Sequence, residues 1–218
     1  MSAKRNEKKS MQTRLLRSTF NKENVEAIVI AVILALFIRT FVVQAFKIPS
    51  GSMEPTLLIG DHILVNKFIY GITIPFTEKK LLQLVKPKRG DVIVFIYPED
   101  PSKDFIKRVM AVEGEQLQIK DKKIFINNKE IDDPYGVYRD SPTTSEWGSE
   151  MSRGNLGPIT VPPHSLFVMG DNRDKSYDSR FWGYVDLNKV KGKAFIIYWS
   201  WGGFFKDIRW GRIGKIIH

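Results

Sequence analysis

The longest apolar stretch of the chain lies close to its N-terminus. Twelve consecutive apolar residues occupy positions 27–38, and after an interruption at Arg39 the apolar pattern resumes as far as position 46. Residues 25–46 would form a helix about 33 Å long at ~1.5 Å per residue, which is enough to cross the apolar core of a bilayer. The pattern therefore predicts a transmembrane helix over residues 23–46.

Residues 1–22 precede this segment and carry seven Lys or Arg against a single acidic residue. Because basic residues beside a span favour the cytoplasmic side, we expect a basic cytoplasmic tail there and an outer location from residue 47 onward. A cleavable signal peptide is the alternative, since residues 43–45 (Val-Gln-Ala) resemble a cleavage site. The long basic region, and Arg39 between the apolar core and that site, favour an uncleaved anchor.

Past residue 47 the pattern changes to short β-branched and aromatic runs separated by turn residues, which is typical of strands. The predicted strands cover residues 63–65, 68–70, 92–97, 105–112, 117–119, 124–126, 165–169 and 194–199. Residues 132–163 are polar and rich in Pro and Gly, so we expect a surface excursion there. The predicted fold class is mainly β, with an N-terminal transmembrane helix followed by a β-rich domain over residues 47–218.

Composition narrows the chemistry. The chain of 218 residues fits one domain of moderate size plus an appendage. It has no cysteine, which excludes a disulfide framework and a cysteine nucleophile, and its three histidines are far apart, so we expect no metal site. The net charge is +10, but residues 1–22 contribute +6 of it. The outer domain thus lacks the basic face of a nucleic-acid binder, and we expect no nucleic-acid partner.

The first candidate for catalysis is a serine in the loop 49–57, Pro-Ser-Gly-Ser-Met-Glu-Pro-Thr-Leu. Taken alone, such a segment is an ordinary turn. It follows the predicted membrane helix within a few residues, so Ser52 would act at the membrane surface. The chain has no GxSxG motif and no histidine near this serine in a known triad motif, so a serine hydrolase here would need another base.

Lys107 is the best-placed lysine for that base, because it stands in the apolar run 105–112. If Phe105, Lys107 and Val109 share one face of a strand, burial lowers the pKa of the lysine from about 10.4 toward neutrality. A neutral amine can take a proton from a serine hydroxyl, and Ser–Lys pairing is a recognised variant of the catalytic triad. The alternative is a surface strand with Lys107 in water and Arg108 pointing inward or paired.

A third segment, residues 170–183, is dense in turn-forming and ionic residues (Gly-Asp-Asn-Arg-Asp-Lys-Ser-Tyr-Asp-Ser-Arg-Phe-Trp-Gly). This density favours a loop held by side-chain hydrogen bonds. The spacing of the acidic residues does not match a calcium-binding loop, and basic residues interrupt it. We therefore expect the acidic residues to pair with the arginines of the same loop.

Taken together, these segments resemble the bacterial type I signal peptidases in their Gram-positive, single-span form. The boxes Ser-Gly-Ser-Met-x-Pro-Thr, Arg-Gly-Asp-Val-Ile-Val-Phe, Lys-Arg-Val and Gly-Asp-Asn-Arg-Asp-x-Ser-x-Asp-Ser-Arg occur in that family's order between residues 25 and 185. Residues 209–214 also look like the ending of some members. The chain departs from the family at residues 111–115, where a Gly-x-Pro-Gly-Asp turn is usual, and at Lys175, where Asn is common.

The resemblance implies a role for each matching residue. Ser52 would be the nucleophile and Lys107 the general base. The Ser50 hydroxyl and the Ser52 amide would form the oxyanion hole, and Ser176 would orient the lysine. A supporting ion pair and a nearby structural acid are also implied, and they correspond to Asp178, Arg180 and Asp171.

The same resemblance implies shallow pockets that admit only small side chains of a substrate. The matching positions are Phe46, Ile48, Pro49 and Ile106. We expect an extended substrate to pair its backbone with an exposed strand edge, for which the strand around residues 105–109 is the candidate.

These expectations combine in a membrane-anchored serine endopeptidase that removes N-terminal signal peptides from exported preproteins. It would cleave Ala-x-Ala-type sites through an acyl-enzyme, without a cofactor, from the outer side of the cell membrane. Its partners would be the preproteins and the lipid bilayer, with the secretion translocon as a further candidate. The alternatives are a Ser/Lys peptidase for another membrane-delivered substrate and a membrane-anchored β-domain without catalytic activity.

Overall fold

The structure is a computed structural model that describes residues 22–73, 80–82, 85–138, 154–203 and 207–218. Apart from Lys22, the predicted basic tail lies outside the described residues. The chain divides into two compact units, residues 1–42 and 43–218, and each is described by itself.

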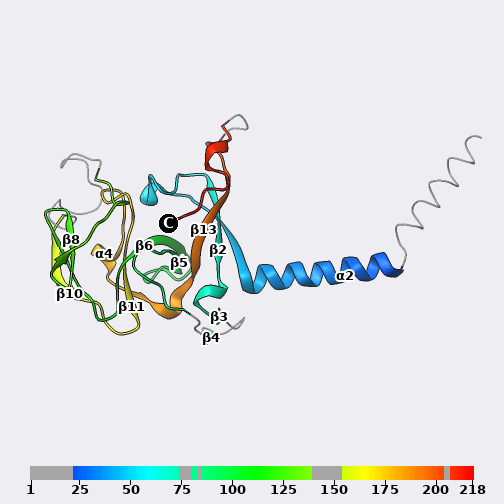
Figure 1. Ribbon diagram of the computed structural model, residues 1–218, viewed down its shortest axis with the longest axis horizontal. Coiled ribbons are helices and arrows are strands. Elements are labelled where there is room, and N and C mark those ends of the chain that lie inside the picture. Colours follow the sequence, from blue (N-terminus) through cyan, green and yellow to red (C-terminus); the bar gives the residue numbers. More distant parts are fainter. Residues whose placement is uncertain (1–21, 74–79, 83–84, 139–153, 204–206) are drawn as a thin grey trace, which may run out of the picture. The chain divides into compact units, whose positions relative to one another are not determined.

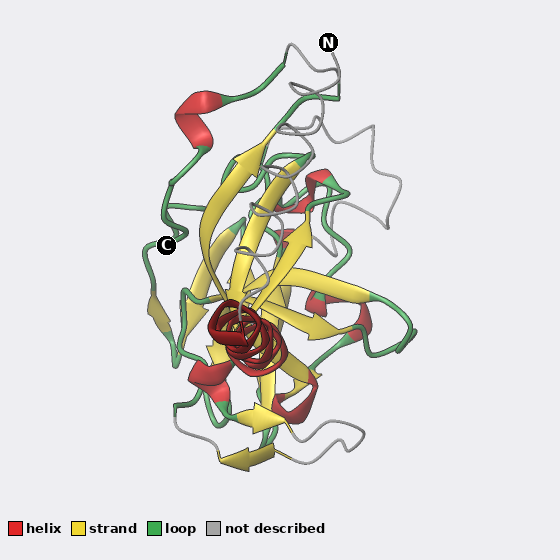
Figure 2. Cartoon of the chain, turned by 90° about the vertical axis from the view of Figure 1, so that its right-hand side faces the viewer, coloured by secondary structure: helices red, strands yellow, loops and turns green. Residues whose placement is uncertain are grey.

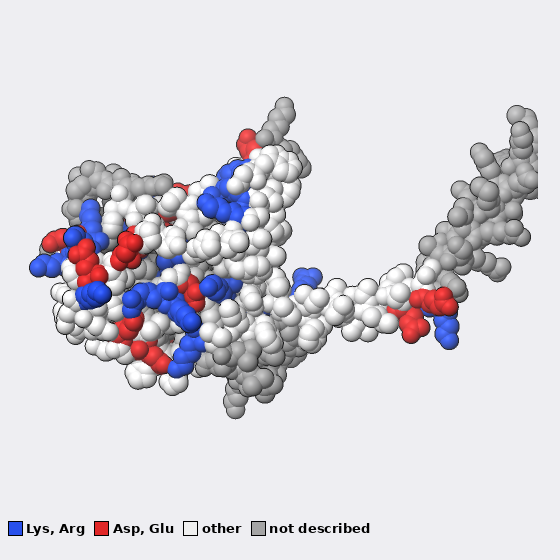
Figure 3. Space-filling model, in the orientation of Figure 1, with Lys and Arg blue, Asp and Glu red and all other residues white. Residues whose placement is uncertain are grey.

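The first unit contains helix α2, Lys22–Phe37, which continues as a π-helical turn, Ile38–Val42 (Figure 1). No α2 residue is buried, and the side chains of Ile30 and Ile33 are 58% and 61% exposed. Charged side chains occur only at the start of α2 (Figure 3). Within the described residues, no helix is both long enough and apolar enough to cross a membrane.

The prediction of one helix over residues 23–46 is wrong beyond residue 42. Val43–Lys47 forms strand β1, which pairs antiparallel with β2, Asp61–Asn66. Val43 is β-branched, and Phe46 packs against the hydrophobic core, so these side chains suit a half-buried strand once a partner strand is present. A short apolar run fits a buried strand as well as it fits a helix, which explains the error.

The second unit is built from strands with only short helical turns (Figure 2). Its main sheet has seven strands in the order β1-β2-β13-β5-β6-β11-β12, and all neighbours are antiparallel. The remaining strands of this sheet are β5 Val92–Ile96, β6 Asp104–Val112, β11 Ser165–Met169, β12 Val185–Asp186 and β13 Val190–Ser200. The mainly β prediction is therefore confirmed.

A second sheet has four strands in the order β10-β7-β8-β9. Its members are β7 Gln116–Lys120, β8 Lys123–Ile126, β9 Lys129–Glu130 and β10 Leu156–Thr160. The antiparallel β7–β8 pair confirms the hairpin predicted from residues 117–126. Strand β10 falls inside the predicted excursion 132–163, so the end of that excursion belongs to a sheet, whereas residues 139–153 lie outside the described residues. A further two-stranded ladder joins β3, Ile72–Thr73, to β4, Lys80–Leu82.

One predicted strand is a helical turn instead. Phe68–Tyr70 forms the 3-10 helix η3, in which the Asn66 side chain accepts a hydrogen bond from the Ile69 amide at 3.1 Å. The Tyr70 hydroxyl donates to Asp91 at 2.8 Å, which draws the ring inward. An Asn that bonds to the backbone three residues on favours a turn over continued strand pairing.

Three clusters of buried side chains form the core, and the first of them supports the candidate site. It joins Ile63 and Val65 of β2, which alternate with less buried neighbours, to Met53 and Leu57 of the loop that carries Ser52. On the face of the second unit seen in Figure 3, Lys and Arg side chains are interspersed with Asp and Glu side chains. The core thus holds the Ser52 loop against the main sheet.

Candidate active site

Ser52 lies in a 3-10 turn, η2 Gly51–Met53, which follows β1 after a short connection. Met53 and Leu57 are fully buried, and the Leu57 amide donates to the Met53 carbonyl at 2.9 Å. Ser52 itself is 7% exposed. Burial of its neighbours therefore fixes the backbone of this loop.

The segment that follows β11 holds the Ser52 loop from the other side. The Asn172 amide donates to the Ser52 carbonyl at 3.1 Å, and its side-chain amide donates to the Gly51 carbonyl at 3.3 Å. A Cβ atom on Gly170 would overlap the Ser52 carbonyl and the Ser176 hydroxyl. The close approach of these two loops thus requires glycine at position 170.

Lys107 reaches this loop from β6. Its Nζ atom donates to Ser52 Oγ at 2.7 Å, and its side chain is buried, with only 4% of the residue exposed. Arg108 points to the opposite face of the strand and is 1% exposed. Both faces of β6 are therefore covered here, and the alternative that leaves Lys107 in water does not hold.

Burial lowers the pKa of Lys107 to about 8, because an ammonium loses its hydration there. The nearby carboxylates of Asp178 and Asp171 act in the opposite direction, and the Arg180 guanidinium adds to the lowering. The Phe105 ring, with its centroid 5.3 Å from Nζ, forms part of the apolar surroundings. A lysine with this pKa is partly neutral at mildly alkaline pH.

Ser176 lies in the same loop as Gly170 and Asp178. Its Oγ atom accepts a hydrogen bond from the Gly170 amide at 3.2 Å and also bonds to the Asp178 carboxylate. No hydrogen bond joins Ser176 to Lys107 within the described part of the chain. The hydrogen bonds of Ser176 thus go to the turn at Gly170 and to Asp178, whereas Lys107 donates to Ser52.

Asp178 and Arg180 form a buried ion pair, with the Nε–Oδ1 distance at 2.9 Å and the Nη2–Oδ2 distance at 3.0 Å. Asp178 also accepts from the Gly170 amide at 3.0 Å, and Arg180 donates to the Arg173 carbonyl at 2.6 Å. Burial acts to raise the pKa of Asp178, but Arg180 and these hydrogen bonds outweigh it and hold the pKa below its usual range. The pair therefore remains ionised and fixes the loop 170–180.

Asp171 forms a second buried ion pair, with Arg108. Two parallel hydrogen bonds of 2.8 and 2.7 Å join the guanidinium to the carboxylate, which also accepts from Thr56 Oγ1 at 2.5 Å. Arg108 donates further to the carbonyls of Gly90 and His218 at 2.8 and 2.6 Å. Asp171 thus connects β6 with the far end of the Ser52 loop.

The predicted oxyanion and pocket residues differ in exposure. Ser50 is exposed and flanks η2, and its side chain makes no capping hydrogen bond. Phe46 and Ile106 are half-buried against the first core cluster, and Pro49 is exposed. Ile48 is only 2% exposed and belongs to that cluster, so its side chain can form no more than the floor of a pocket.

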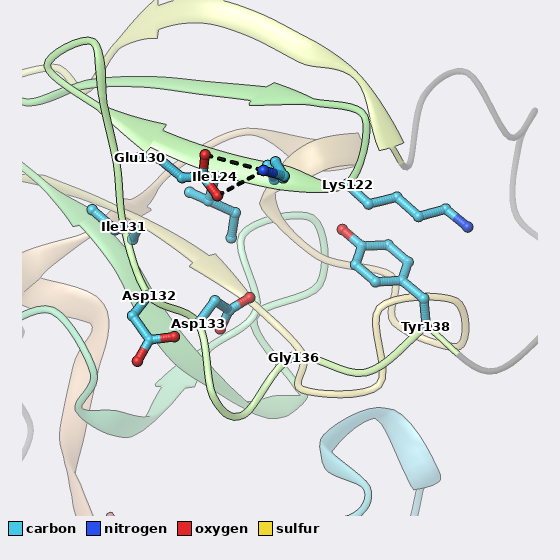
Figure 4. A pocket seen from close by; sticks show the side chains of 9 residues that line it. Lys122, Ile124, Glu130, Ile131, Asp132, Asp133, Gly136 and Tyr138 are labelled. Carbon is cyan, nitrogen blue, oxygen red and sulfur yellow. Dashed lines mark hydrogen bonds and ion pairs between the residues drawn. The ribbon is translucent and has the colours of Figure 1, made fainter.

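A cavity of about 580 Å³ lies elsewhere on the second unit, and none of the predicted site residues lines it (Figure 4). Its walls come from β8, β9 and the loop that follows them, and consist of Lys122, Lys123, Ile124, Glu130, Ile131, Asp132, Asp133, Gly136 and Tyr138. In the described part of the chain, no three His, Cys, Asp or Glu side chains are placed to hold a metal ion.

The expected pairing within residues 170–183 holds for Asp178 with Arg180. In contrast, Asp171 pairs with Arg108 and Arg173 pairs with Asp133, and both of these partners lie outside that loop.

The sequence patterns assigned no role in the site to several residues that hold it together. Thr56, Arg108, Asn172 and Arg173 all contact the Ser52 loop or the residues that support it. Their residue types indicate that they are hydrogen-bonded, since buried polar side chains in an apolar strand or a turn-rich loop need partners. Their partners are up to 121 positions away in the chain, so spacing alone does not reveal them.

A comparison with protein families decides the classification. The model of the family described as signal peptidase, peptidase S26, matches residues 21–199. The chain belongs to the signal peptidase S26 family. The resemblance to type I signal peptidases is thereby confirmed, and the narrower likeness to the Gram-positive form stays a prediction.

Curated members of the family are similar over most of the chain. A signal peptidase I of Pseudomonas fluorescens is 40% identical over 195 residues, which cover 77% of this chain and 69% of the relative. A signal peptidase I of Aquifex aeolicus is 34% identical over 228 residues, covering 82% and 84%. A solved structure, of a signal peptidase I from Enterococcus faecalis, is 29% identical, with a TM-score of 0.40 over 50% of this chain and 97% of that one.

Proposed function

We propose that this signal peptidase family member is a serine endopeptidase that removes N-terminal signal peptides from exported preproteins, with Ser52 as nucleophile and Lys107 as base. The observation that carries the assignment is the 2.7 Å contact between Lys107 Nζ and Ser52 Oγ in a buried setting. Burial lowers the pKa of this lysine to about 8, and a neutral amine at hydrogen-bond distance is what a general base requires.

In the acylation step, neutral Lys107 accepts the proton of the Ser52 hydroxyl while Oγ attacks the carbonyl carbon of the scissile peptide. The resulting oxyanion is stabilised by the Ser52 amide and the Ser50 hydroxyl. The lysine ammonium then gives its proton to the leaving amine, so the C–N bond breaks and the signal peptide stays attached to Ser52 as an ester. Lys107 returns to its neutral form in this step.

In the deacylation step, Lys107 takes a proton from a water molecule, whose oxygen attacks the ester carbonyl. Collapse of the second tetrahedral intermediate breaks the bond to Ser52 Oγ, and the lysine returns its proton to that oxygen. One water is consumed, and the enzyme regains its starting state. The ion pairs at Asp171 and Asp178 keep the surrounding loops fixed through both steps.

Substrate choice would follow from a shallow apolar surface near Ser52, to which we assign Phe46, Pro49 and Ile106. In support, Phe46 and Ile106 pack against the core cluster that contains Ile48 and Met53, the residue after Ser52. Such a surface accepts Ala at the −1 and −3 positions of a precursor and excludes larger side chains by overlap.

The substrate backbone would pair with the first part of β6. Residues 108–112 of this strand pair with β11, so the prediction of a free edge over residues 105–109 is wrong at Arg108 and Val109. The β11 ladder ends at Met169, opposite Arg108, and residues 104–107 pair only with β5. This short free segment ends at Lys107, where an extended peptide would meet the base.

We further propose that the first unit binds the protein to the cell membrane, with the catalytic unit on the outer side. The apolar side chains of α2 have no cover in the described structure, as with Val29 at 49% and Leu34 at 55% exposure. In a helix the backbone hydrogen bonds are made within the segment, so a helix with apolar side chains is stable in the apolar core of a bilayer. Carbonate extraction of the full chain tests this: wild type stays in the membrane pellet, and Ile30→Lys with Ile33→Lys moves to the supernatant.

The enzymatic proposal is tested by cleavage of a precursor with Ala at −3 and −1 in detergent-solubilised membranes. Ser52→Ala should lower turnover by at least about 10³-fold, because a missing nucleophile removes the acyl-enzyme route. Ser165→Ala is the matched control, since this serine on β11 donates only to the Pro163 carbonyl. Equal turnover of wild type and Ser52→Ala would refute the proposal.

A further inference from the structure

Residues 132–138, which we call the strap, run alongside the loop that holds Ser52. The Val137 amide donates to the Asp171 carbonyl at 2.8 Å, and the Arg173 amide donates to the Val137 carbonyl at 2.9 Å. These bonds place Val137 opposite Asn172 in a parallel bridge. The strap is therefore joined by its backbone to the residues that contact the Ser52 carbonyl.

Asp133 joins the strap to a fully buried guanidinium. Arg173 is 0% exposed, its Nη2 donates to Asp133 Oδ1 at 2.9 Å, and its Nη1 lies 2.5 Å from Oδ2. The same guanidinium donates from Nε to the Gly170 carbonyl at 3.0 Å. A Cβ atom on Gly136 would overlap the ends of the Asp133 and Arg173 side chains, so any larger residue there would displace this ion pair.

Tyr135 makes the second side-chain contact. The centroid of its ring lies 3.8 Å from the Arg108 guanidinium carbon, which is a stacking distance. Arg108 is the residue that holds Asp171, and it directly follows Lys107 on β6. The ring covers one face of this guanidinium and so keeps water from the Arg108–Asp171 pair.

The strap also lines the cavity of Figure 4, where Asp132 and Asp133 point in different directions. Asp132 is exposed, whereas the Asp133 side chain is 17% exposed and turned to Arg173. Of these two neighbouring acids, only Asp133 contacts Arg173, so Asp132 provides a matched control for substitutions of Asp133.

We propose that the strap positions the catalytic pair, with Asp133 and Tyr135 as positioning residues that act through Arg173 and Arg108. The inference rests on the proposed function of Ser52 and Lys107. Asp133 fixes Arg173 and thereby Gly170, while Tyr135 fixes Arg108 and thereby Asp171. Both routes end at the Ser52 loop. The first reaches the Ser52 carbonyl through the Asn172 amide, and the second reaches the Thr56 side chain through Asp171. The hydrogen bonds, ion pair and ring contact described above join the strap to residues 171–173 and to Arg108, and not to the proposed pocket residues, so we expect its loss to affect the chemical step more than substrate binding.

The test measures kcat and KM of the full chain on a peptide with Ala at −3 and −1. Tyr135→Leu should lower kcat about tenfold or more with KM within about twofold, since small displacements of reacting groups are costly. Tyr135→Phe keeps the ring face and should stay within about twofold of wild type. Asp133→Asn should lower kcat in the same way, and Asp132→Asn should leave it unchanged.

Thermal unfolding of each variant is measured as well. The kcat values are compared at a temperature at which every variant is folded, so that a loss of stability is not mistaken for a loss of catalysis. The proposal is overturned if Tyr135→Leu and Asp133→Asn then match wild type, if their losses appear in KM, or if Tyr135→Phe and Asp132→Asn lose as much. A wild-type chain that fails to cleave the peptide would instead overturn the proposed function, so the two failures are distinct.

Discussion

At the scale of single residues, the site depends on a lysine in surroundings that disfavour its charge. Lys107 is enclosed by β6, the Phe105 ring and the Ser52 loop, and burial lowers its pKa to about 8. The two nearest ion pairs, Arg108–Asp171 and Arg180–Asp178, are each balanced in charge. Desolvation therefore dominates, and the lysine is the group near the nucleophile that can give up its proton.

The pH dependence of cleavage follows from this pKa. Only neutral Lys107 can accept the Ser52 proton, so kcat/KM should rise about tenfold per pH unit below pH 8 and level off above it. The measurement uses a peptide without groups that titrate in this range. A profile that is flat from pH 6 to pH 10 would contradict a lysine base.

The same burial costs stability. The pKa of Lys107 falls from 10.5 in the unfolded chain to about 8 in the fold, so the cost is fully present below pH 8 and disappears as the pH rises past 10.5. Lys107→Met should raise the unfolding free energy at pH 7 by roughly 2–3 kcal/mol and abolish turnover. Urea unfolding of wild type and Lys107→Met at pH 7 and pH 10 checks this. The difference in unfolding free energy between the two proteins should be smaller at pH 10. A variant less stable than wild type at pH 7 would contradict the cost assigned to the buried charge.

Ser50 offers a free hydroxyl beside the nucleophile. Because the oxyanion forms only during the reaction, Ser50→Ala should lower kcat by about 10²–10³ and leave KM nearly unchanged. Ser50→Thr keeps a hydroxyl and serves as the control. An effect confined to KM would move Ser50 from the oxyanion hole to ground-state binding.

At the scale of elements, β6 carries most of the site. Ile106 and Lys107 are consecutive and so point to opposite faces of the strand. In the proposed function, this one strand supplies both a pocket residue and the base. The strand pairs with β5 over residues 104–108 and with β11 over residues 108–112. Residues 104–107, at the start of the strand, pair with β5 on one side and have no β11 partner on the other.

The pocket can be tested at this element. Ile106 is half-buried against the first core cluster, so Ile106→Ala should enlarge the surface that faces a small side chain. Cleavage of precursors with Val at −1, relative to Ala, should rise in the variant before overall turnover is lost. The rates of wild type and Ile106→Ala on Ala, Val and Leu precursors are compared. An unchanged ranking would remove Ile106 from the pocket.

Elements with a regular pattern were predictable from the sequence, and those set by tertiary contacts were not. The alternation of residues 117–126 predicts the β7–β8 hairpin, and the apolar run 92–97 predicts β5. The strand at residues 43–47 was missed because its apolar residues continue a helical run, and its partner β2 alone decides the outcome. Residues 68–70 became a helical turn through the Asn66 side chain, a contact that strand propensity does not include.

At the scale of the whole molecule, the main sheet brings distant segments of the chain together. Ser52 and Lys107 are 55 positions apart, and Arg108 and Asp171 are 63 positions apart. Sequence patterns alone placed a serine in a turn and a lysine in an apolar strand, and the family resemblance joined them. The hydrogen bonds that hold the loops, such as Asn172 to Ser52, depend on the folded backbone and so could not be read from residue types.

The central claim is that Lys107 acts as a base, and Lys107→Arg tests it most directly. Arginine keeps the positive charge and much of the length but does not lose its proton in a protein. Processing of a precursor with Ala at −3 and −1 is measured for wild type, Lys107→Arg and Lys107→Ala, with thermal unfolding as the control for folding. The account predicts that both variants lose turnover to a similar extent, by about 10³-fold or more. Near-normal processing by a folded Lys107→Arg protein would contradict it.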